Sequence, residues 1–235
     1  MMIITSKIIF KPSIKKLKAL EANEKLEIIT SEFPENIKMV EEILDIIENN
    51  KIKKEFVRPK VEIVEDTKTS LYIAVTNKIL IADMKNNYAR IQTIAHECIH
   101  SSQNKALIFF NFIISNINIL FFLALVGLTL FRVIEMNILL VAVLTIMILT
   151  QFAVRIYLEV DAMKKARLLA EEYINKKIAG NDELNLTKED KEKLLKGYDK
   201  INEEGIPFMI DYFLTTALVK ILIYATIGVL LLKFT

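Results

Sequence analysis

Long runs of apolar residues, separated by charged stretches, divide the chain. Residues Ala106–Phe131 contain no charged side chain, and Ile134–Tyr157 follows after Arg132 with charges only near its ends. A membrane-spanning helix needs about 20 apolar residues at ~1.5 Å rise per residue, so both runs are long enough to span. Because only a short polar stretch around Arg132 separates them, they predict an antiparallel transmembrane hairpin. A third run, Pro207–Leu232, contains two ionisable residues, so we expect two to three transmembrane helices.

The charged part before the first apolar run alternates between helical and strand periodicity. Apolar positions at helical spacing predict two helices near the start and one at the end, and short β-branched segments between them predict an edge strand and a hairpin. The expected helices are Ser13–Ile29, Glu35–Asn50 and a segment from Asn86 to about Lys105, the edge strand is Phe56–Val64, and the hairpin strands are Leu71–Val75 and Ile79–Ala82. Residues 1–105 are therefore expected to form a small α/β domain.

The charged part after the second run predicts two more helices. Arg155–Lys177 has apolar residues at helical spacing, and Thr187 begins a capping-box pattern for a polar helix that ends at about Glu204. Gly205 and Pro207 are expected to break the chain before the third apolar run. The predicted domains are thus 1–105, the hairpin 106–157, the charged helices 158–206 and a C-terminal transmembrane helix 207–235.

Composition and charge narrow the functional classes. Apolar residues make up 53% of the chain and charged residues 26%, which is typical of a membrane protein with polar parts. The net charge of +2 excludes a strongly basic nucleic-acid-binding protein, and a single cysteine excludes a disulfide framework or a multi-cysteine metal cluster. Lysines and arginines concentrate in both polar parts, so the positive-inside rule predicts a multi-pass protein of the cytoplasmic membrane whose polar parts face the cytoplasm.

Polar residues inside the apolar runs have individual interpretations. Asn111, Asn116 and Asn118 are expected to form hydrogen bonds between helices. Asp211 is expected at the membrane interface, while Lys220 either extends its amine to the interface or faces the helix bundle. A role for either residue in function stays open at this point.

Both histidines of the chain lie in His96-Glu97-Cys98-Ile99-His100. A spacing of four residues on a helix places both imidazoles on one face. There, each ring can bind the same metal ion at about 2.0–2.1 Å from one of its nitrogens. This H-E-x-x-H pattern is that of zinc hydrolases, in which the glutamate is the general base. We therefore expect Zn²⁺ as cofactor, His96 and His100 as ligands, and Glu97 as the catalytic residue.

The third ligand must be a carboxylate or Cys98, because no third histidine exists. Cys98 points away from both histidines and is interpreted as a core residue. The predicted hairpin returns the chain to the membrane face where the histidine helix ends, so Glu159 or Asp161 is expected there. The two lie about 200° apart on a helix, so they are not expected to bind one ion together. We favour Glu159 as ligand and leave open for Asp161 a supporting role or that of a surface carboxylate paired with Arg155, Lys164 or Lys165.

The order of these features resembles the YugP-type neutral zinc metallopeptidases of bacterial membranes. It is more distantly similar to the HtpX and CAAX-prenyl-protease group of membrane gluzincins. The resemblance extends from about Thr69 to Leu232 and depends on Ala95–His100, Glu159-Val-Asp161-Ala162 and the last apolar run. It implies an α+β, mainly helical integral membrane protein with a zincin-like cytoplasmic part. It also implies a zinc endopeptidase with ligands His96, His100 and Glu159 and catalytic base Glu97.

A peptide or protein substrate, including one associated with the membrane, is expected to lie extended along an edge strand, for which we favour Leu71–Val75. Gln92 and Gln103 lie near the histidine face, and neither is assigned as a donor to the oxyanion. The alternative function is a non-catalytic membrane protein with a structural or sensory zinc site. A transporter is disfavoured, because the apolar runs contain few ionisable residues that could pair.

Overall fold

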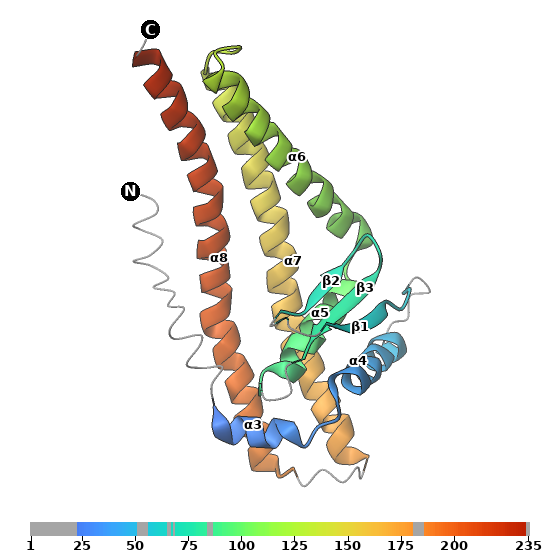
Figure 1. Ribbon diagram of the computed structural model, residues 1–235. Coiled ribbons are helices and arrows are strands. Elements are labelled where there is room, and N and C mark those ends of the chain that lie inside the picture. Colours follow the sequence, from blue (N-terminus) through green and yellow to red (C-terminus); the bar gives the residue numbers. More distant parts are fainter. Residues whose placement is uncertain are drawn as a thin grey trace. The chain divides into compact units, whose positions relative to one another are not determined.

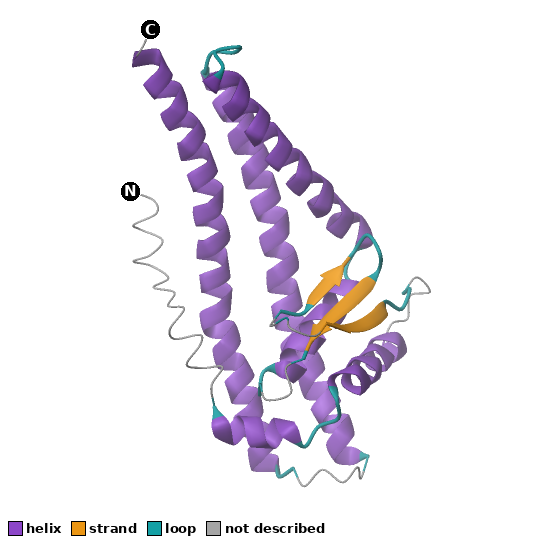
Figure 2. Cartoon of the chain, in the orientation of Figure 1, coloured by secondary structure: helices purple, strands orange, loops and turns teal. Residues whose placement is uncertain are grey.

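The computed structural model describes residues 23–50, 56–64, 67, 69–83, 87–180 and 186–233. Over these ranges the protein is mainly helical, with one small sheet (Figure 2). The described residues divide into two compact units. The membrane unit comprises residues 106–157 and 208–233, and the sheet unit comprises the described residues up to 105 together with 158–180 and 186–207.

Three helices provide the apolar segments. They are α6 (Lys105–Leu130), α7 (Ile138–Ala179) and α8 (Lys188–Lys233), and Figure 1 shows them as the longest helices. Each is long and apolar enough to cross a membrane, which includes the third run that the sequence left uncertain. The second apolar run and the charged helix after it are one continuous helix of 42 residues, about 63 Å at ~1.5 Å per residue.

The expected break before the third run is wrong. Helix α8 continues through Gly205 and Pro207 without interruption. A proline inside a helix removes one backbone hydrogen bond and costs about 3 kcal/mol. Residues on both sides stabilise the helix independently, because Leu194 and Tyr198 pack in the core of the sheet unit and the segment after Pro207 is apolar. The chain therefore keeps its helical path and loses only the local hydrogen bond.

The membrane unit has a small packed centre and an apolar exterior. Leu125 of α6, Leu144 and Ile148 of α7, and Ala217 and Tyr224 of α8 form its buried cluster. Many other large apolar side chains are exposed, as expected for helices whose surroundings are lipid.

One of the three asparagines links helices as expected. The amide of Asn118 in α6 donates to Met147 O and to Gln151 Oε1 of α7, at 3.0 and 2.7 Å. Asn116 instead donates to Phe112 O in its own helix, so the expectation is wrong there, and the buried Oδ1 of Asn111 has no partner among the described residues.

The sheet has three strands in the order β1-β3-β2. Strand β1 (Lys60–Val64) is parallel to β3 (Lys78–Ala82), and β2 (Leu71–Ile73) is antiparallel to β3. The predicted hairpin and the edge position of β1 are therefore confirmed. The turn between β2 and β3 ends at Asn77, whose φ of 47° lies in the left-handed region that asparagine tolerates.

Helices α3 (Glu24–Ser31), α4 (Asn36–Asn50) and α5 (Arg90–Ser102) complete the sheet unit. Residues 13–22 of the first predicted helix lie outside the described residues, and the other two predicted helices are confirmed with shorter bounds. Helix α5 contacts α4, β2 and β3. Its buried side chains Ile91, Ile94 and Ala95 share one core with the small residues of α7, such as Ala162 and Ala166. This packing holds α5 between the sheet and α7 (Figure 1).

Candidate metal centre

Helix α5 brings its two histidines together. The Nε2 atoms of His96 and His100 lie 3.0 Å apart, and the two rings meet edge to face with centroids 4.5 Å apart. The spacing of four positions along one helix explains this proximity, because the side chains at positions i and i+4 lie one above the other on the same face. Both side chains are only partly buried, with exposed fractions of 20% for His96 and 16% for His100. The imidazole face is thus accessible to a small ligand.

Helix α7 adds a carboxylate to this pair. Glu159 Oε2 lies 3.4 Å from His96 Nε2 and 3.5 Å from His100 Nε2, and one ligand atom from each residue lies within 4.8 Å of the others. Donor atoms about 2.0–2.1 Å from a tetrahedral zinc ion are roughly 3.3 Å apart. The three observed separations are near this value. Two imidazole nitrogens and one carboxylate oxygen are also a donor set of catalytic zinc, so the residues fit the ion.

Gln103 determines the state of His100. Its Oε1 lies 2.9 Å from His100 Nδ1, while its Nε2 donates to Leu158 O at 2.8 Å and to Asp161 Oδ2 at 3.0 Å. Both Nε2 partners only accept hydrogen bonds, which fixes the orientation of the amide. The Gln103 oxygen must therefore accept from Nδ1–H of His100. In the neutral ring this leaves a lone pair on Nε2, directed to the side where Glu159 lies.

Glu97 lies beside the three donors but is not one of them. Its side chain is buried, and its Oε2 accepts a hydrogen bond of 2.6 Å from the backbone N–H of Tyr72. Tyr72 lies in β2, which forms an edge of the described sheet. Because this N–H is directed to Glu97 and not to β3, the outer edge of β2 faces the carboxylate.

The charges of the site shift its pKa values in opposite directions. Burial acts to raise the pKa of Glu159, but the hydrogen bonds and charges of His100 and His96 outweigh it and lower this pKa well below its usual range. Burial acts to lower the pKa of His100, and the contact with Glu159 raises it overall. Burial also raises the pKa of Glu97, although both histidines and Tyr72 N–H oppose the shift. Glu159 is thus the more strongly ionised carboxylate and Glu97 the more basic one.

The remaining predicted residues have different surroundings. Asp161 does not join the donor group; it accepts from Gln103 Nε2 and pairs with Lys165 Nζ at 2.7 Å, so both roles left open for it are present. Cys98 is fully buried in the core, as expected. The side-chain amide of Gln92 donates to Asn202 Oδ1 in α8 at 2.7 Å.

Sequence reasoning missed the contacts of Gln103 and Tyr72. Gln103 follows His100 by three residues, close to one helical turn, and this spacing was the available signal for its contact with the imidazole. No local pattern pointed to Tyr72, because its contact with Glu97 joins residues 25 positions apart.

Comparisons with known proteins assign neither a family nor a function to the chain. No protein-family model matches the chain, and no curated protein and no solved structure match it. The chemistry of the site therefore has to be argued from its own residues.

Proposed function

We propose that this protein is a membrane-embedded, zinc-dependent endopeptidase. His96, His100 and Glu159 would hold the ion, and Glu97 would act as the general base. One observation carries the proposal: the buried carboxylate of Glu97 lies next to the donor group, is not part of it, and is held by the backbone of an edge strand. A closed structural zinc site has four protein ligands and needs no such carboxylate.

A zinc ion at this site would lower the pKa of a coordinated water to about 7 and polarise a substrate carbonyl. Glu97 would accept the proton of the attacking water and return it to the leaving amine of the peptide bond. Its pKa, raised by burial, suits it to both proton transfers. Gln103 and Asp161 would keep the His100 ring in the orientation and tautomer that present Nε2.

The edge of β2 supplies a binding surface for the substrate. In an extended strand the N–H and C=O of one residue point to the same side. Tyr72 N–H points away from β3, so Tyr72 C=O is also available along the outer edge. A peptide backbone lying along this edge would pass the site in an extended conformation, without selection for particular side chains. The substrate class is thus an extended segment of a peptide or protein.

The side of the membrane on which the site lies determines which substrates can reach it. Most lysines and arginines lie in the two charged parts, and the turn between the first two apolar runs has only Arg132, which supports a site facing the cytoplasm at the cytoplasmic membrane. Helix α7 contributes both an apolar segment and Glu159, so one residue of the site lies on a helix long and apolar enough to span the bilayer.

The test is zinc content and proteolysis of the full chain purified in detergent. The wild type should bind one zinc ion and cleave an unstructured protein such as casein. Glu97→Gln should keep the zinc and lose cleavage by about 10²–10⁴-fold, the usual contribution of a general base. Glu32→Gln, which changes an exposed carboxylate in the same unit, is the matched control and should behave as wild type.

The alternatives give different results. A chain that binds zinc but cleaves neither casein nor peptides derived from membrane proteins supports the structural or sensory zinc site. Cleavage that survives Glu97→Gln contradicts the assigned base. Absence of zinc binding in the wild type overturns the metal centre itself.

A further inference from the structure

Gln92 links α5 to α7 at the end of the metal centre opposite Gln103. Its side-chain Nε2 donates to Asn202 Oδ1 in α8 at 2.7 Å, and Asn202 Nδ2 donates to Met163 O in α7 at 3.2 Å. Met163 lies about one helical turn after Glu159, whereas Gln103 contacts α7 at the residue before Glu159. The metal donors therefore lie between two glutamine contacts.

These hydrogen bonds fix the orientation of the Gln92 amide. The carbonyl of Met163 can only accept, so Asn202 directs its Nδ2 to Met163 and its Oδ1 to Gln92. Gln92 must then donate through Nε2, which leaves its Oε1 as an acceptor. This oxygen is buried and has no hydrogen-bond partner among the residues that the structure describes, and the whole residue is 6% exposed. A buried acceptor without a donor costs free energy, so we expect it to serve a donor nearby.

His96 has a matching donor. Its Nε2 lies 3.0 Å from His100 Nε2 and belongs to the metal donors. When Nε2 binds an ion, the neutral ring has its proton on Nδ1, and this N–H needs an acceptor. In the described part of the chain Nδ1 of His96 has no such partner. A helical side chain leans over the turn that precedes it, and the residue one turn before His96 is Gln92.

His100 already shows the equivalent arrangement. Its Nδ1 lies 2.9 Å from Gln103 Oε1, while Gln103 Nε2 is held by α7. Gln92 has the same parts, because its amide nitrogen is held by a neighbouring helix and its oxygen remains for an imidazole about one turn away.

We propose that Gln92 is a positioning residue that accepts the Nδ1 proton of His96, directly or through one water, when His96 Nε2 binds the metal ion. This inference rests on the metal centre of the proposed function and does not depend on the hydrolysis. Asn202 contributes by holding the Gln92 amide in the orientation that presents Oε1. Each histidine ligand then has its own glutamine, which keeps the ring in the tautomer that offers Nε2 to the metal.

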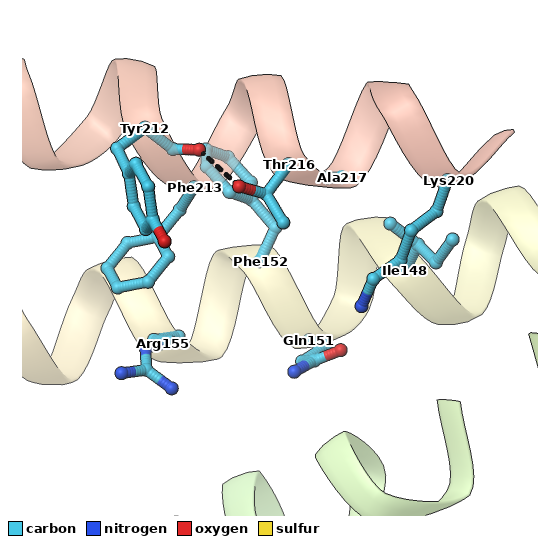
Figure 3. A pocket seen from close by; sticks show the side chains of 9 residues that line it. All are labelled: Ile148, Gln151, Phe152, Arg155, Tyr212, Phe213, Thr216, Ala217 and Lys220. Atoms are coloured by element: carbon cyan, nitrogen blue, oxygen red, sulfur yellow. Dashed lines mark hydrogen bonds between the residues drawn. The ribbon is translucent and has the colours of Figure 1, made fainter. Parts of the chain in front are cut away.

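Gln151 of α7 provides a matched control, because both ends of its amide are occupied. Its Nε2 donates to Ser115 Oγ at 2.9 Å, and its Oε1 accepts from Asn118 at 2.7 Å. Figure 3 shows Gln151 in the lining of a pocket of about 380 Å³ in the membrane unit. Removal of this amide takes hydrogen bonds from the fold and none from the metal centre.

Zinc affinity of the full chain in detergent, measured by competition with a chelator, tests the proposal. Gln92→Leu should weaken zinc binding by about 10–100-fold, the usual effect of losing the partner of a histidine ligand. Gln92→Glu keeps an oxygen that can accept from Nδ1–H and should retain most of the affinity. Gln151→Leu makes the same chemical change elsewhere and should bind zinc as the wild type does.

NMR of the zinc-bound protein separates positioning from a loss of stability. The chain has only two histidines, so labelling histidine with ¹⁵N gives the signals of two imidazole rings. In the wild type both rings should be protonated at Nδ1, with both protons protected from exchange with water. In Gln92→Leu the His96 proton alone should lose its protection, because Gln103 still holds His100.

Four results would overturn the proposal. Rapid exchange of the His96 Nδ1 proton in the zinc-bound wild type contradicts it without any variant, which covers a Gln92→Leu chain that fails to fold. Unchanged zinc affinity in Gln92→Leu excludes the positioning role and leaves the metal centre in place. Equal loss of protection at both rings, not reversed by Gln92→Glu, would make the role of Gln92 purely structural. A wild type that binds no zinc overturns this inference together with the proposed function, whereas zinc binding without proteolysis overturns only the latter.

Discussion

Gln103 accepts a hydrogen bond from His100: Oε1 of the amide and Nδ1 of the ring lie 2.9 Å apart. The same amide donates to Leu158 O and Asp161 on α7. One side chain thus joins the end of α5 to the helix that carries Glu159. The contact fixes the ring of His100 while it holds the two helices that supply the metal donors.

Replacing Gln103 with leucine should reduce zinc affinity by about 10–100-fold, the usual effect of losing the group that orients a histidine ligand. Leucine keeps much of the volume and removes both the acceptor for Nδ1–H and the donor to Asp161. Competition with a chromogenic zinc chelator measures the change. Ser102→Ala, in the same turn of α5, removes a hydroxyl that donates to Ile99 O and should leave the affinity as it was. Equal affinities for Gln103→Leu and wild type would show that the contact does not support metal binding.

Glu159→Gln should lose zinc far more completely than Asp161→Asn. The first change removes a charged donor that lies 3.4–3.5 Å from both imidazole nitrogens. The second removes the charge of a group that acts on the site only through Gln103. The zinc content per chain after dialysis shows which of the two variants loses more zinc. A chain that keeps its zinc after Glu159→Gln and loses it after Asp161→Asn would reverse the assignment of the third ligand.

Tyr72→Pro tests the role of the β2 edge. Proline removes the N–H that donates to Glu97, and an edge strand tolerates proline where the N–H faces outward. We expect cleavage efficiency to fall roughly tenfold below that of Tyr72→Ala, because a hydrogen bond to a charged group is worth about 1.5–3 kcal/mol. Tyr72→Ala is the control, since it removes the same ring and keeps the N–H. Zinc content should be equal in both, and equal cleavage by both would exclude a role for this N–H.

Arg90 is expected to stabilise the sheet unit from within. The residue is 3% exposed, and its guanidinium donates to Thr30 O, Phe33 O and Asn36 Oδ1. Arg90→Leu leaves these buried acceptors without a donor, so the free energy of unfolding should fall by about 3–5 kcal/mol.

The control for Arg90 is Arg58, which pairs with Glu41, Asp45 and Glu48 at the surface. Arg58→Leu should cost only about 1 kcal/mol, as is usual for exposed ion pairs. Urea unfolding in detergent, followed by tyrosine fluorescence in this tryptophan-free chain, measures both. Equal losses of stability would contradict the structural role of Arg90.

Asn118 and Asn116 form a matched pair inside α6. Asn118 donates across to Met147 O and Gln151 of α7, and Asn116 donates only to Phe112 O of its own helix. Asn118→Leu should destabilise the membrane unit by about 0.6–2 kcal/mol, and Asn116→Leu should be nearly neutral. Unfolding by sodium dodecyl sulfate from mixed micelles provides the measurement. A larger effect at Asn116 would contradict the hydrogen bond between α6 and α7.

The sequence by itself determined the features that depend on neighbours along the chain. Three apolar runs of sufficient length predicted α6, α7 and the last part of α8, because helix length and hydropathy are local properties. The spacing of His96 and His100 predicted a shared face of one helix, and alternation with a turn at Asn77 predicted the β2–β3 hairpin.

Tertiary structure decided which distant groups meet. From sequence, Glu159 was only favoured over Asp161 as third ligand, and the packing of α5 against α7 is what directs Glu159 to the imidazoles and Asp161 to Gln103. Pro207 predicted a break, yet packing on both of its sides keeps α8 continuous. Contacts between residues far apart depend on how whole helices pack, and no pattern within a few residues contains that information.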